Sequence, residues 1–324
     1  MELTQKNAAQ YLQRRGIGLS APRISELGGG VSNTVLLVEA DAGRLVLKQA
    51  LGKLRVEQDW RADRERIFRE SAALRKLAQH FPDGSLPTVV FEDRDNFAFA
   101  MTAAPSSSVC WKERLLGGEI RVETAERVGA LLALMASVSW RNEAWESEFG
   151  DQTVFDQLRI DPYYRATARK HPDLAPAASR LIEESAARRV SLTHGDWSPK
   201  NFLVDGNQVM AIDFEVIHFG DPAFDSAFLL NHLVLKSFHR PQWAGLYAQA
   251  AEGFWRKYLS GVPAEAWIEP ATLQHLGWLM LARVDGKSPA EYLRDPVIQE
   301  RVRRFARDLI VSPPGSVAEV FGRM

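Results

Sequence analysis

Apolar and polar residues alternate over short runs in the first hundred positions, and this pattern predicts a sheet. An apolar run covers 35–38, a turn covers 41–43, and a second run covers 44–48. These runs predict antiparallel strands joined by a tight turn. Residues 89–101 contain two further strand-like runs, interrupted by the polar stretch 92–96. We expect a small antiparallel sheet in this part of the chain.

Two segments of the same part have the spacing of amphipathic helices. Ala8, Tyr11 and Leu12 recur at helical intervals after Thr4, which we expect to cap the first helix. The second pattern covers residues 63–78. An initial helix and one longer helix should therefore accompany the sheet.

After Pro105 the periodicity is almost wholly helical. The exception is a pair of apolar runs around 201–204 and 209–212, which the turn at 205–207 joins into a predicted strand pair. The pattern predicts an α+β protein with a small lobe that contains the sheet and a larger, mostly helical lobe.

The change of pattern divides the chain at a predicted hinge over residues 101–105. We expect an N-lobe over 1–101 and a C-lobe over 102–324. The length of 324 residues is ample for two lobes with buried cores.

Composition and charge narrow the function. The residues are 46% hydrophobic and 25% charged, which is typical of a globular protein. Because the formal net charge is -1, we expect no positive electrostatic field that would attract DNA or RNA. The single cysteine, Cys110, excludes a disulfide framework and a cysteine cluster for zinc or iron, which fits a reducing cytoplasm. Residues 1–16 lack the apolar core of a secretory signal, and the apolar stretch near Ala130 is too short to span a bilayer. We expect a soluble cytoplasmic protein.

The segment 194–215, HGDWSPKNFLVDGNQVMAIDFE, holds the strongest chemical signal. It places an Asn five positions after Asp196 and places Asp213 beyond a short hairpin. This spacing resembles the catalytic and metal loops shared by protein kinases and small-molecule kinases. Gly195 stands where protein kinases have arginine, and this loop looks like those of the aminoglycoside phosphotransferase and choline kinase superfamily. The resemblance implies a protein-kinase-like two-lobed fold, ATP and Mg²⁺ as cofactors, and a small molecule with a hydroxyl group as acceptor.

The same resemblance gives roles to the polar residues of this segment. Asp196 is the catalytic residue, which accepts the hydrogen bond and the proton of the substrate hydroxyl. Asn201 and Asp213 offer a neutral and a charged oxygen to Mg²⁺. Glu215 faces the same side as Asp213 on an extended segment. It is either a second carboxylate ligand, as in methylthioribose kinases, or a partner for the substrate or a lysine.

Two further residues are interpreted as supports of the catalytic loop, and Lys200 is a candidate for contact with the phosphate or substrate. The analogous histidine of this fold braces the metal loop, so we interpret His194 as structural rather than as a general base. Asp225 resembles the buried aspartate that accepts hydrogen bonds from the loop amides. Lys200 either reaches the transferring phosphate or is merely solvated.

Lys48 and Glu70 are the expected partners at the nucleotide. Lys48 shares a strand face with Val46, so Val46 would cover adenine while the ammonium reaches the phosphates. Glu70 lies on the apolar stripe of the second helical segment, whereas Glu65 points away. Because an unpaired buried carboxylate is costly, we predict an ion pair between Lys48 and Glu70.

The remaining nucleotide contacts are predicted from position. A glycine run before the strand pair would let backbone amides approach the phosphates. Leu203 and Ile212 are interpreted as the apolar floor for the base, and the hinge backbone as its hydrogen-bond partner. The loop set is Gly28, Gly29, Gly30, Ser32 and Asn33, and the hinge set is Met101, Thr102 and Ala103.

The N-terminal part carries a second resemblance. The stretches LTQKNAAQYLQRRG, LGGGVSNTV and LVLKQALGKLRVEQDW look like the amino-terminal lobe of methylthioribose kinases. The catalytic loop departs from that family, which usually lacks this Asn and has Asp-Pro-Glu where this chain has Asp213-Phe214-Glu215. A methylthioribose-like sugar or small alcohol is the leading acceptor, with aminoglycoside, choline and homoserine as alternatives.

Two charged residues, Arg283 and Asp285, end an apolar helical segment and are the candidates for binding the acceptor. Arg283 resembles the arginine that methylthioribose kinases use near their substrate. Ser288, Pro289 and Glu291 then predict a capping box at the start of another helix.

Two alternatives from other functional classes stay open. One is a non-catalytic nucleotide-binding module with a kinase fold, although such proteins typically lose at least one residue of the set that is intact here. The other is a metal-dependent phosphohydrolase or nuclease that uses His194, Asp196 and Asp213 and does not need Lys48. A protein substrate is disfavoured because no Ala-Pro-Glu anchor is found.

Overall fold

The computed structural model describes residues 1–18, 20–28, 33–41, 43–52 and 63–324. These form two compact units, of which the first comprises Met1–Ser107 and Met210–Glu215 and the second comprises Ser108–Val209 and Val216–Met324. Residues 101–105, where we expect a hinge, begin at the end of strand β5 (Ala98–Thr102), and the first unit continues to Ser107. The segment Met210–Glu215 groups with the N-terminal residues, and Ala211 N donates to Ser85 O (2.9 Å).

The first unit contains an antiparallel sheet, with strand order β1-β2-β3-β5-β4 within its described residues. The central strands β2 and β3 pair with Leu36 opposite Leu47, which confirms the strand pair predicted from the apolar runs. β3 pairs with β5 on its other side, with Lys48 opposite Phe99. The strands are β1 (Arg23–Glu26), β2 (Asn33–Ala40), β3 (Gly43–Ala50), β4 (Val89–Asp93) and β5.

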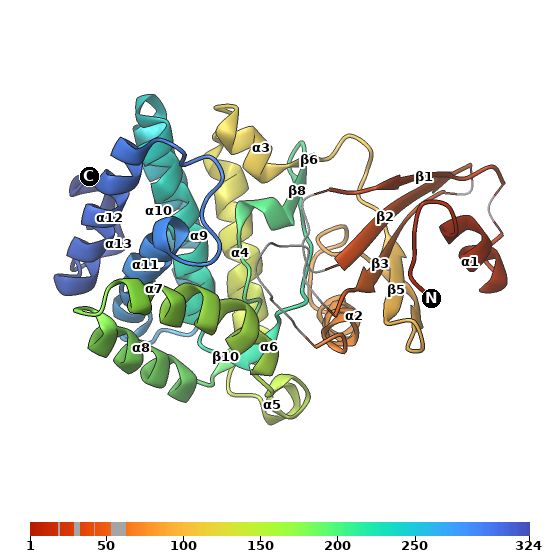
Figure 1. Ribbon diagram of the computed structural model, residues 1–324, viewed down its shortest axis with the longest axis horizontal. Helices are drawn as coiled ribbons and strands as arrows, with labels where there is room; N and C mark the ends of the chain where they lie inside the picture. Colours follow the sequence, from red (N-terminus) through yellow and green to blue (C-terminus); the bar gives the residue numbers. More distant parts are fainter. Residues whose placement is uncertain (19, 29–32, 42, 53–62) are drawn as a thin grey trace. The chain divides into compact units, whose positions relative to one another are not determined.

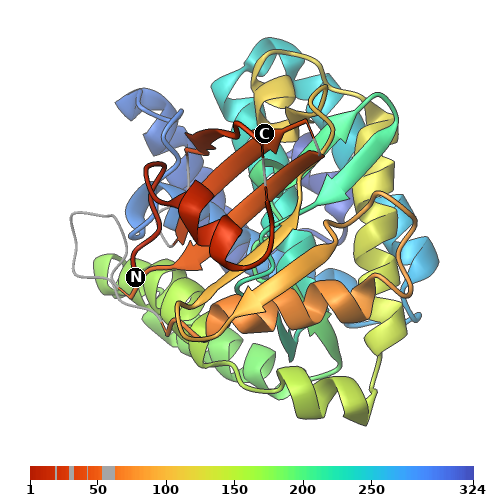
Figure 2. The same cartoon turned by 90° about the vertical axis from the view of Figure 1, so that its right-hand side faces the viewer.

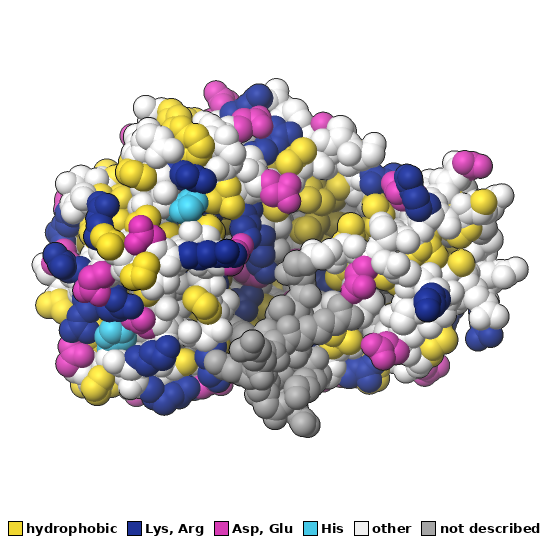
Figure 3. Space-filling view, turned by 45° about the horizontal axis from the view of Figure 1, so that its top comes forward, with side chains coloured by type: hydrophobic (Ala, Val, Ile, Leu, Met, Phe, Trp, Pro, Cys, Tyr) yellow, Lys and Arg dark blue, Asp and Glu magenta, His cyan; other side chains and the backbone are white. Residues whose placement is uncertain are grey.

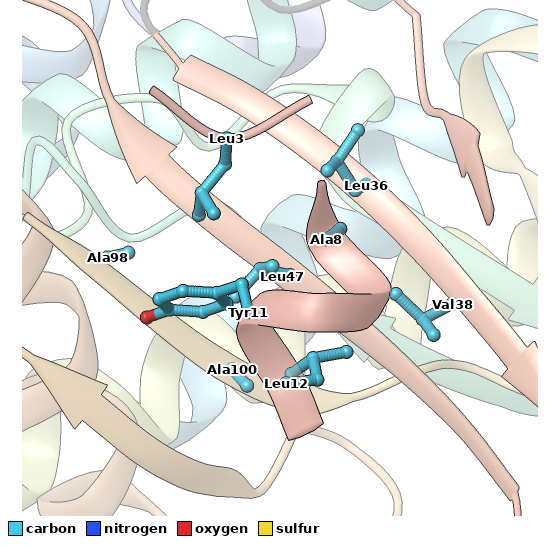
Figure 4. Packing of buried hydrophobic residues seen from close by; sticks show 9 residues of the cluster. All are labelled: Leu3, Ala8, Tyr11, Leu12, Leu36, Val38, Leu47, Ala98 and Ala100. Atoms are coloured by element: carbon cyan, nitrogen blue, oxygen red, sulfur yellow. The ribbon is translucent and has the colours of Figure 1, made fainter. Parts of the chain in front are cut away.

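Helix α1 (Ala8–Arg14) covers one face of this sheet, and Figure 2 shows it lying across β2 and β3. Its buried residues are those predicted, and they pack on alternate residues of the strands (Figure 4). The start of the helix differs from the prediction: Asn7 is the N-cap, and Thr4 lies in the preceding turn, where its carbonyl accepts from Ala8 N (3.1 Å). The contacting residues are Leu3, Ala8, Tyr11, Leu12, Leu36, Val38, Leu47, Ala98 and Ala100.

Helix α2 (Arg66–Leu77) packs against β3, β4 and β5 and corresponds to the second predicted helix. Ile67, Glu70 and Leu74 are buried, as the helical stripe predicted, while Glu65 is exposed. Since neighbouring residues of a strand point to opposite faces, Leu47 belongs to the α1 side and Lys48 to the other. The sheet thus places Lys48 and Glu70 on the same side.

The second unit is mostly helical, and α4, α9 and α10 pack side by side (Figure 1). Helix α9 is buried on every side from Pro222 to Phe238. The longer helices are α4 (Val122–Ser139), α8 (Ala175–Ala187), α9 (Pro222–His239), α10 (Ala244–Gly261), α11 (Ile268–Asp285) and α12 (Pro296–Val311). The shorter ones are α3 (Trp111–Leu116), α5 (Glu143–Phe149), α6 (Thr153–Phe155), α7 (Ala166–Lys170) and α13 (Val317–Gly322). The π-helix η1 (Asp156–Arg165) and the 3-10 helices η2 (Pro199–Asn201) and η3 (Pro241–Trp243) complete the helical elements that the structure describes.

Short strands frame the segment with the kinase-like motif. β7 (Ser191–Thr193) pairs with β10 (His218–Gly220), and a second small sheet has the order β6-β8-β9. β8 (Phe202–Asp205) and β9 (Gln208–Ala211) are the predicted strand pair. β6 (Val109–Cys110), β7 and β10 were not predicted, because runs this short carry no readable alternation.

Charged side chains of both signs are interspersed on the face that Figure 3 draws, in keeping with the formal net charge of -1.

Over the described ranges, we find no helix whose length and apolar character would let it cross a membrane.

Candidate active site

Lys48 is held between two carboxylates of the first unit. Its Nζ lies 2.7 Å from Glu70 Oε2 and 2.5 Å from Asp213 Oδ1. Lys48 and Glu70 are almost completely buried, whereas the Asp213 side chain is 25% exposed. The predicted ion pair between Lys48 and Glu70 is confirmed, and the structure adds Asp213 to it.

The electrostatics of this cluster keep the lysine charged. Burial alone would lower the pKa of Lys48, but the charges of Asp213 and Glu70 outweigh it and raise the pKa above its ordinary value. Burial raises the pKa of Glu70 against the opposing ammonium of Lys48, and Asp213 adds to the rise. An ammonium fixed in this way can hold the phosphate groups of a nucleotide.

Asp213 has a left-handed backbone conformation with φ 69°. Such a conformation is uncommon outside glycine, although aspartate tolerates it better than most residues. Asp213 lies two residues after the end of β9, and its backbone departs there from the extended conformation.

Glu215 is tied to two donors of the first unit. Its Oε2 accepts from Asn33 Nδ2 (2.7 Å) and from Arg66 Nε (3.1 Å). Arg66 is buried and also donates to the carbonyls of Asp63 (2.6 Å) and Leu51 (3.0 Å). Glu215 therefore connects the segment after β9 to the start of β2 and to the first turn of α2.

The predicted nucleotide loop is described only in part. Gly29, Gly30 and Ser32 lie outside the described residues, and Gly28 is exposed. Asn33 begins β2 and contacts Glu215.

The other predicted nucleotide residues lie on strands or next to them. Val46 and Met101 are opposite one another on β3 and β5, and both are buried. At the expected hinge, Thr102 N donates to Thr88 O (2.9 Å) and Ala103 N donates to Arg44 O (3.3 Å).

Leu203 and Ile212 lie in different units. Leu203 is on β8 opposite Cys110 in the second unit, and Ile212 follows β9 in the first. Both are partly buried.

In the second unit, Asp225 fixes the backbone of the motif loop. Its Oδ2 accepts from His194 N (2.5 Å) and its Oδ1 accepts from Gly195 N (2.9 Å). Asp225 is fully buried in the first turn of α9, and burial raises its pKa to about 7 although both amides oppose this. The contact predicted for Asp225 is confirmed.

Gly195 has a conformation that only glycine adopts easily there. Its φ is +75°, and an added Cβ would lie 2.7 Å from Val216 Cγ1 and 3.0 Å from Val216 O. The absence of a side chain at this position lets the loop pass Val216 closely.

Asp196 follows Gly195 and is surrounded by cations. Arg159 NH2 lies 3.1 Å and Lys200 Nζ 2.9 Å from Asp196 Oδ2, and Arg159 Nε also donates to Gly195 O. Burial alone would raise the pKa of Asp196, but Lys200 and Arg159 lower it well below its usual range. Asp196 is thus held as a carboxylate, and Arg159 was not among the predicted site residues.

Asn201 and His194 complete the loop. Asn201 Nδ2 donates to Asp196 O (2.9 Å). The side-chain oxygen of Asn201 is then the atom that can act as an acceptor. His194 is fully buried, and its Nδ1 accepts from Asp196 N (3.2 Å), a contact that suits the bracing role we expected.

The predicted metal ligands are divided between the units, because Asp213 and Glu215 belong to the first and Asn201 to the second.

Arg283, at the end of α11, binds the segment that follows it. Its NH1 donates to Ser288 O (2.6 Å), to Ser288 Oγ (2.8 Å) and to Tyr163 OH (3.2 Å). The capping box predicted at Ser288 is wrong: residues 288–291 are not helical, and the next helix, α12, begins at Pro296 with Asp295 as N-cap. Ser288 does not cap a helix, because both its carbonyl oxygen and its hydroxyl accept hydrogen bonds from Arg283.

Asp285 is engaged with two cations. Arg303 donates to both of its oxygens (2.8 and 2.9 Å), and His171 Nε2 lies 2.8 Å from Oδ2. The Asp285 carboxylate thus ties α11 to α12 and to the residue after α7.

Comparison with protein families gives one match over most of the chain. The model of the phosphotransferase enzyme family matches residues 23–261.

Individual proteins agree with this match. Methylthioribose kinase 2 of Oryza sativa subsp. japonica is 27% identical over 253 residues, which cover 69% of this chain and 59% of the rice enzyme. The chain therefore spans less than two thirds of that relative.

Two solved structures share the fold. An amicoumacin kinase in complex with AMP-PNP and Ca²⁺ superposes with a TM-score of 0.59 at 15% identity, covering 94% of each chain. A choline/ethanolamine kinase family protein from Mesorhizobium loti has a TM-score of 0.56 at 16% identity, covering 99% of this chain and 100% of that one. The predicted kinase-like fold is confirmed.

Proposed function

We propose that this chain, which belongs to the phosphotransferase enzyme family, transfers the γ-phosphate of ATP to a hydroxyl group of a small molecule. The observation that carries the proposal is the contact of Lys48 with both Glu70 and Asp213. Kinases need the lysine, its glutamate and the metal-binding aspartate in place together. The names of the relatives, among them methylthioribose kinase, support the same reaction class.

In the proposed reaction, the acceptor hydroxyl oxygen forms a bond to the γ-phosphorus. The bond from that phosphorus to the oxygen bridging the β and γ phosphates breaks, and ADP leaves. The hydroxyl proton passes to the Asp196 carboxylate. Because Arg159 and Lys200 make this carboxylate a weak base, it takes the proton late, when bond formation has made the hydroxyl acidic.

The donor set fits Mg²⁺, which prefers carboxylate and carbonyl oxygens. Asp213 and Asn201 would hold the ion, which when bound neutralises charge on the phosphates. We propose for Glu215 the pairing role rather than the ligand role, because one of its oxygens already accepts from Asn33 and Arg66. Lys48 and the described part of the glycine loop would hold the phosphates of ATP.

The acceptor is proposed to be a small hydroxyl compound, with methylthioribose and similar sugars the first to test. The experiment is Mg²⁺-dependent release of ADP from ATP across methylthioribose, other pentoses, aminoglycosides, choline and homoserine, with Asp196→Asn alongside. Release that one acceptor stimulates and the variant loses supports the proposal. Phosphoester cleavage without ATP would instead indicate a phosphohydrolase, and ATP binding without turnover of any acceptor would indicate a binding module.

A further inference from the structure

Lys236 is a completely buried lysine in α9. The hydrogen-bond partner of its Nζ is the carbonyl of His232 (3.3 Å), and the Tyr292 ring centroid lies 5.1 Å away. Over the part of the chain that the structure describes, it forms no ion pair. A buried ammonium without a carboxylate partner is costly, so its position calls for an explanation.

Two cations act on Lys236. Burial, together with the charges of Lys112 and Arg283, lowers the pKa of Lys236 to about 7 against the opposing charges of Glu291 and Cys110. Glu291 itself is paired with Lys112 and is more than half exposed. Lys112 is therefore matched by a carboxylate, whereas Lys236 and Arg283 form no ion pair within the described residues.

Charge interactions and a chain of contacts connect this cluster to Asp196. His232 is one helical turn before Lys236, and the charges of Lys236, Arg283 and Asp196 all act on it. Asp196 forms an ion pair with Arg159. The guanidinium of Arg159 lies 5.8 Å from the centroid of the Tyr163 ring. The hydroxyl of Tyr163 in turn accepts a hydrogen bond from Arg283.

Two buried donors in the cluster are unused. Arg283 Nε and Tyr292 OH have no hydrogen-bond partner among the described residues. Such groups are normally satisfied, and each is a donor that an anion could accept from.

We propose that Lys236, Arg283 and His232 form a subsite for an anionic group, a carboxylate or a phosphate, on the acceptor whose hydroxyl meets Asp196. This inference rests on the proposed kinase function and favours hydroxy acids, sugar acids or sugar phosphates as the acceptor over neutral sugars such as methylthioribose. An anion would supply the counter-charge that the cluster lacks. Cationic acceptors such as aminoglycosides and choline would be repelled by it.

The kinetic test compares neutral acceptors with related anionic ones. The pairs are glycerol with glycerate, ribose with ribonate and ribose with ribose 5-phosphate, and the last two pairs separate carboxylate from phosphate. We expect the charged member to have a kcat/KM higher by about tenfold or more, with the preference lost in Lys236→Met and weakened in Arg283→Lys. The KM for ATP should not change.

Lys236→Met should remain folded, because it replaces an unmatched buried charge with an apolar chain of similar length. Lys170→Met is the matched control, since Lys170 is an exposed lysine of the same unit. An equal preference in both variants would overturn the subsite, and so would a preference of the wild type for neutral or cationic acceptors.

A binding measurement separates the subsite from the kinase reaction. Malonate or inorganic phosphate, compared with sodium chloride at equal ionic strength, should raise the Tm of the wild type and of Lys170→Met more than that of Lys236→Met. Equal increases in all three proteins overturn the subsite whatever the enzyme turns over. A selective increase without turnover of any acceptor keeps the subsite and removes the kinase proposal.

Discussion

The guanidinium of Arg159 lies 3.1 Å from the carboxylate of Asp196 and also donates to the carbonyl of Gly195. Both side chains are at least nine-tenths buried. In protein kinases an arginine stands directly before the catalytic aspartate, whereas here Gly195 occupies that position and the guanidinium comes from η1. Of the two cations paired with Asp196, Arg159 thus comes from a distant part of the sequence and Lys200 from the same loop.

Replacing Arg159 should therefore change the titration of Asp196. Arg159→Met removes one of the two cations that lower the pKa of Asp196, so that pKa rises and the acid limb of kcat/KM moves to higher pH. We also expect kcat to fall by roughly tenfold or more, because the loop loses its contact to Gly195 O. The measurement is the pH profile of both proteins.

Arg165→Met is the control, since Arg165 is a partly exposed arginine of the same helix and pairs with Asp156. An acid limb that stays in place in Arg159→Met would mean that Lys200 alone sets the charge state of Asp196.

Gly195→Ala should destabilise the loop for two separable reasons. The left-handed φ costs about 1–2 kcal/mol for a residue with a side chain. The new methyl group also meets Val216 Cγ1 at 2.7 Å. In a Val216→Ala background the contact with Cγ1 is removed, so the loss of unfolding free energy caused by Gly195→Ala should be smaller there by about 1 kcal/mol. Denaturant unfolding of the four proteins gives this difference, and strictly additive losses would show that the clash is relieved elsewhere.

Several parts of this site were readable from the sequence because the signals are local or periodic. Glu70 lies on the apolar stripe of a helix, and Lys48 lies on an alternating strand, so periodicity alone placed both on buried faces. The pairing of Asp225 with the loop amides followed from the resemblance of the motif. Each of these expectations needed only a pattern within one element or one motif.

Arg159 was missed because its partners are far away in the sequence. Arg159 and Gly195 are 36 positions apart. The π-helical hydrogen bonding of η1 also breaks the 3.6-residue period on which face assignments depend. The one departure visible in the sequence was Gly195, which stands where protein kinases have arginine.

The segment after α11 was misread for a related reason. Ser288, Pro289 and Glu291 have the local composition of a helix start, but Arg283 binds the carbonyl and the hydroxyl of Ser288. A contact with the preceding helix thus overrode the local capping signal.

Lys48 and Glu70 should act as one unit in catalysis. We expect Lys48→Met and Glu70→Gln each to lower kcat/KM by about tenfold or more, since the first removes the phosphate-binding charge and the second frees its orientation. The double variant should lose much less than the product of the two effects, because Glu70 acts through Lys48. Steady-state kinetics of the four proteins with varied ATP test this. Multiplicative losses would indicate that Glu70 contributes independently of the lysine.

Asp225 should make the stability of the protein depend on pH. Its pKa is raised by burial from 3.8 to about 7 in the folded state, so between these values the folded chain holds a proton that the unfolded chain has lost. The unfolding free energy of the wild type should therefore fall as pH rises from about 4 to about 7, by a few kcal/mol at most from this group.

Asp225→Asn removes the titrating group but keeps one oxygen acceptor, so its unfolding free energy should change less over the same range. Asp308→Asn is the control, because Asp308 is a surface aspartate whose side chain is 58% exposed. Denaturant unfolding of the three proteins at pH 4 to 7.5 measures the difference. The opposite outcome is that the unfolding free energies of the wild type and Asp225→Asn change with pH in parallel. Asp225 would then be ionised throughout that range, because the hydrogen bonds from the amides of His194 and Gly195 offset the cost of burying its carboxylate.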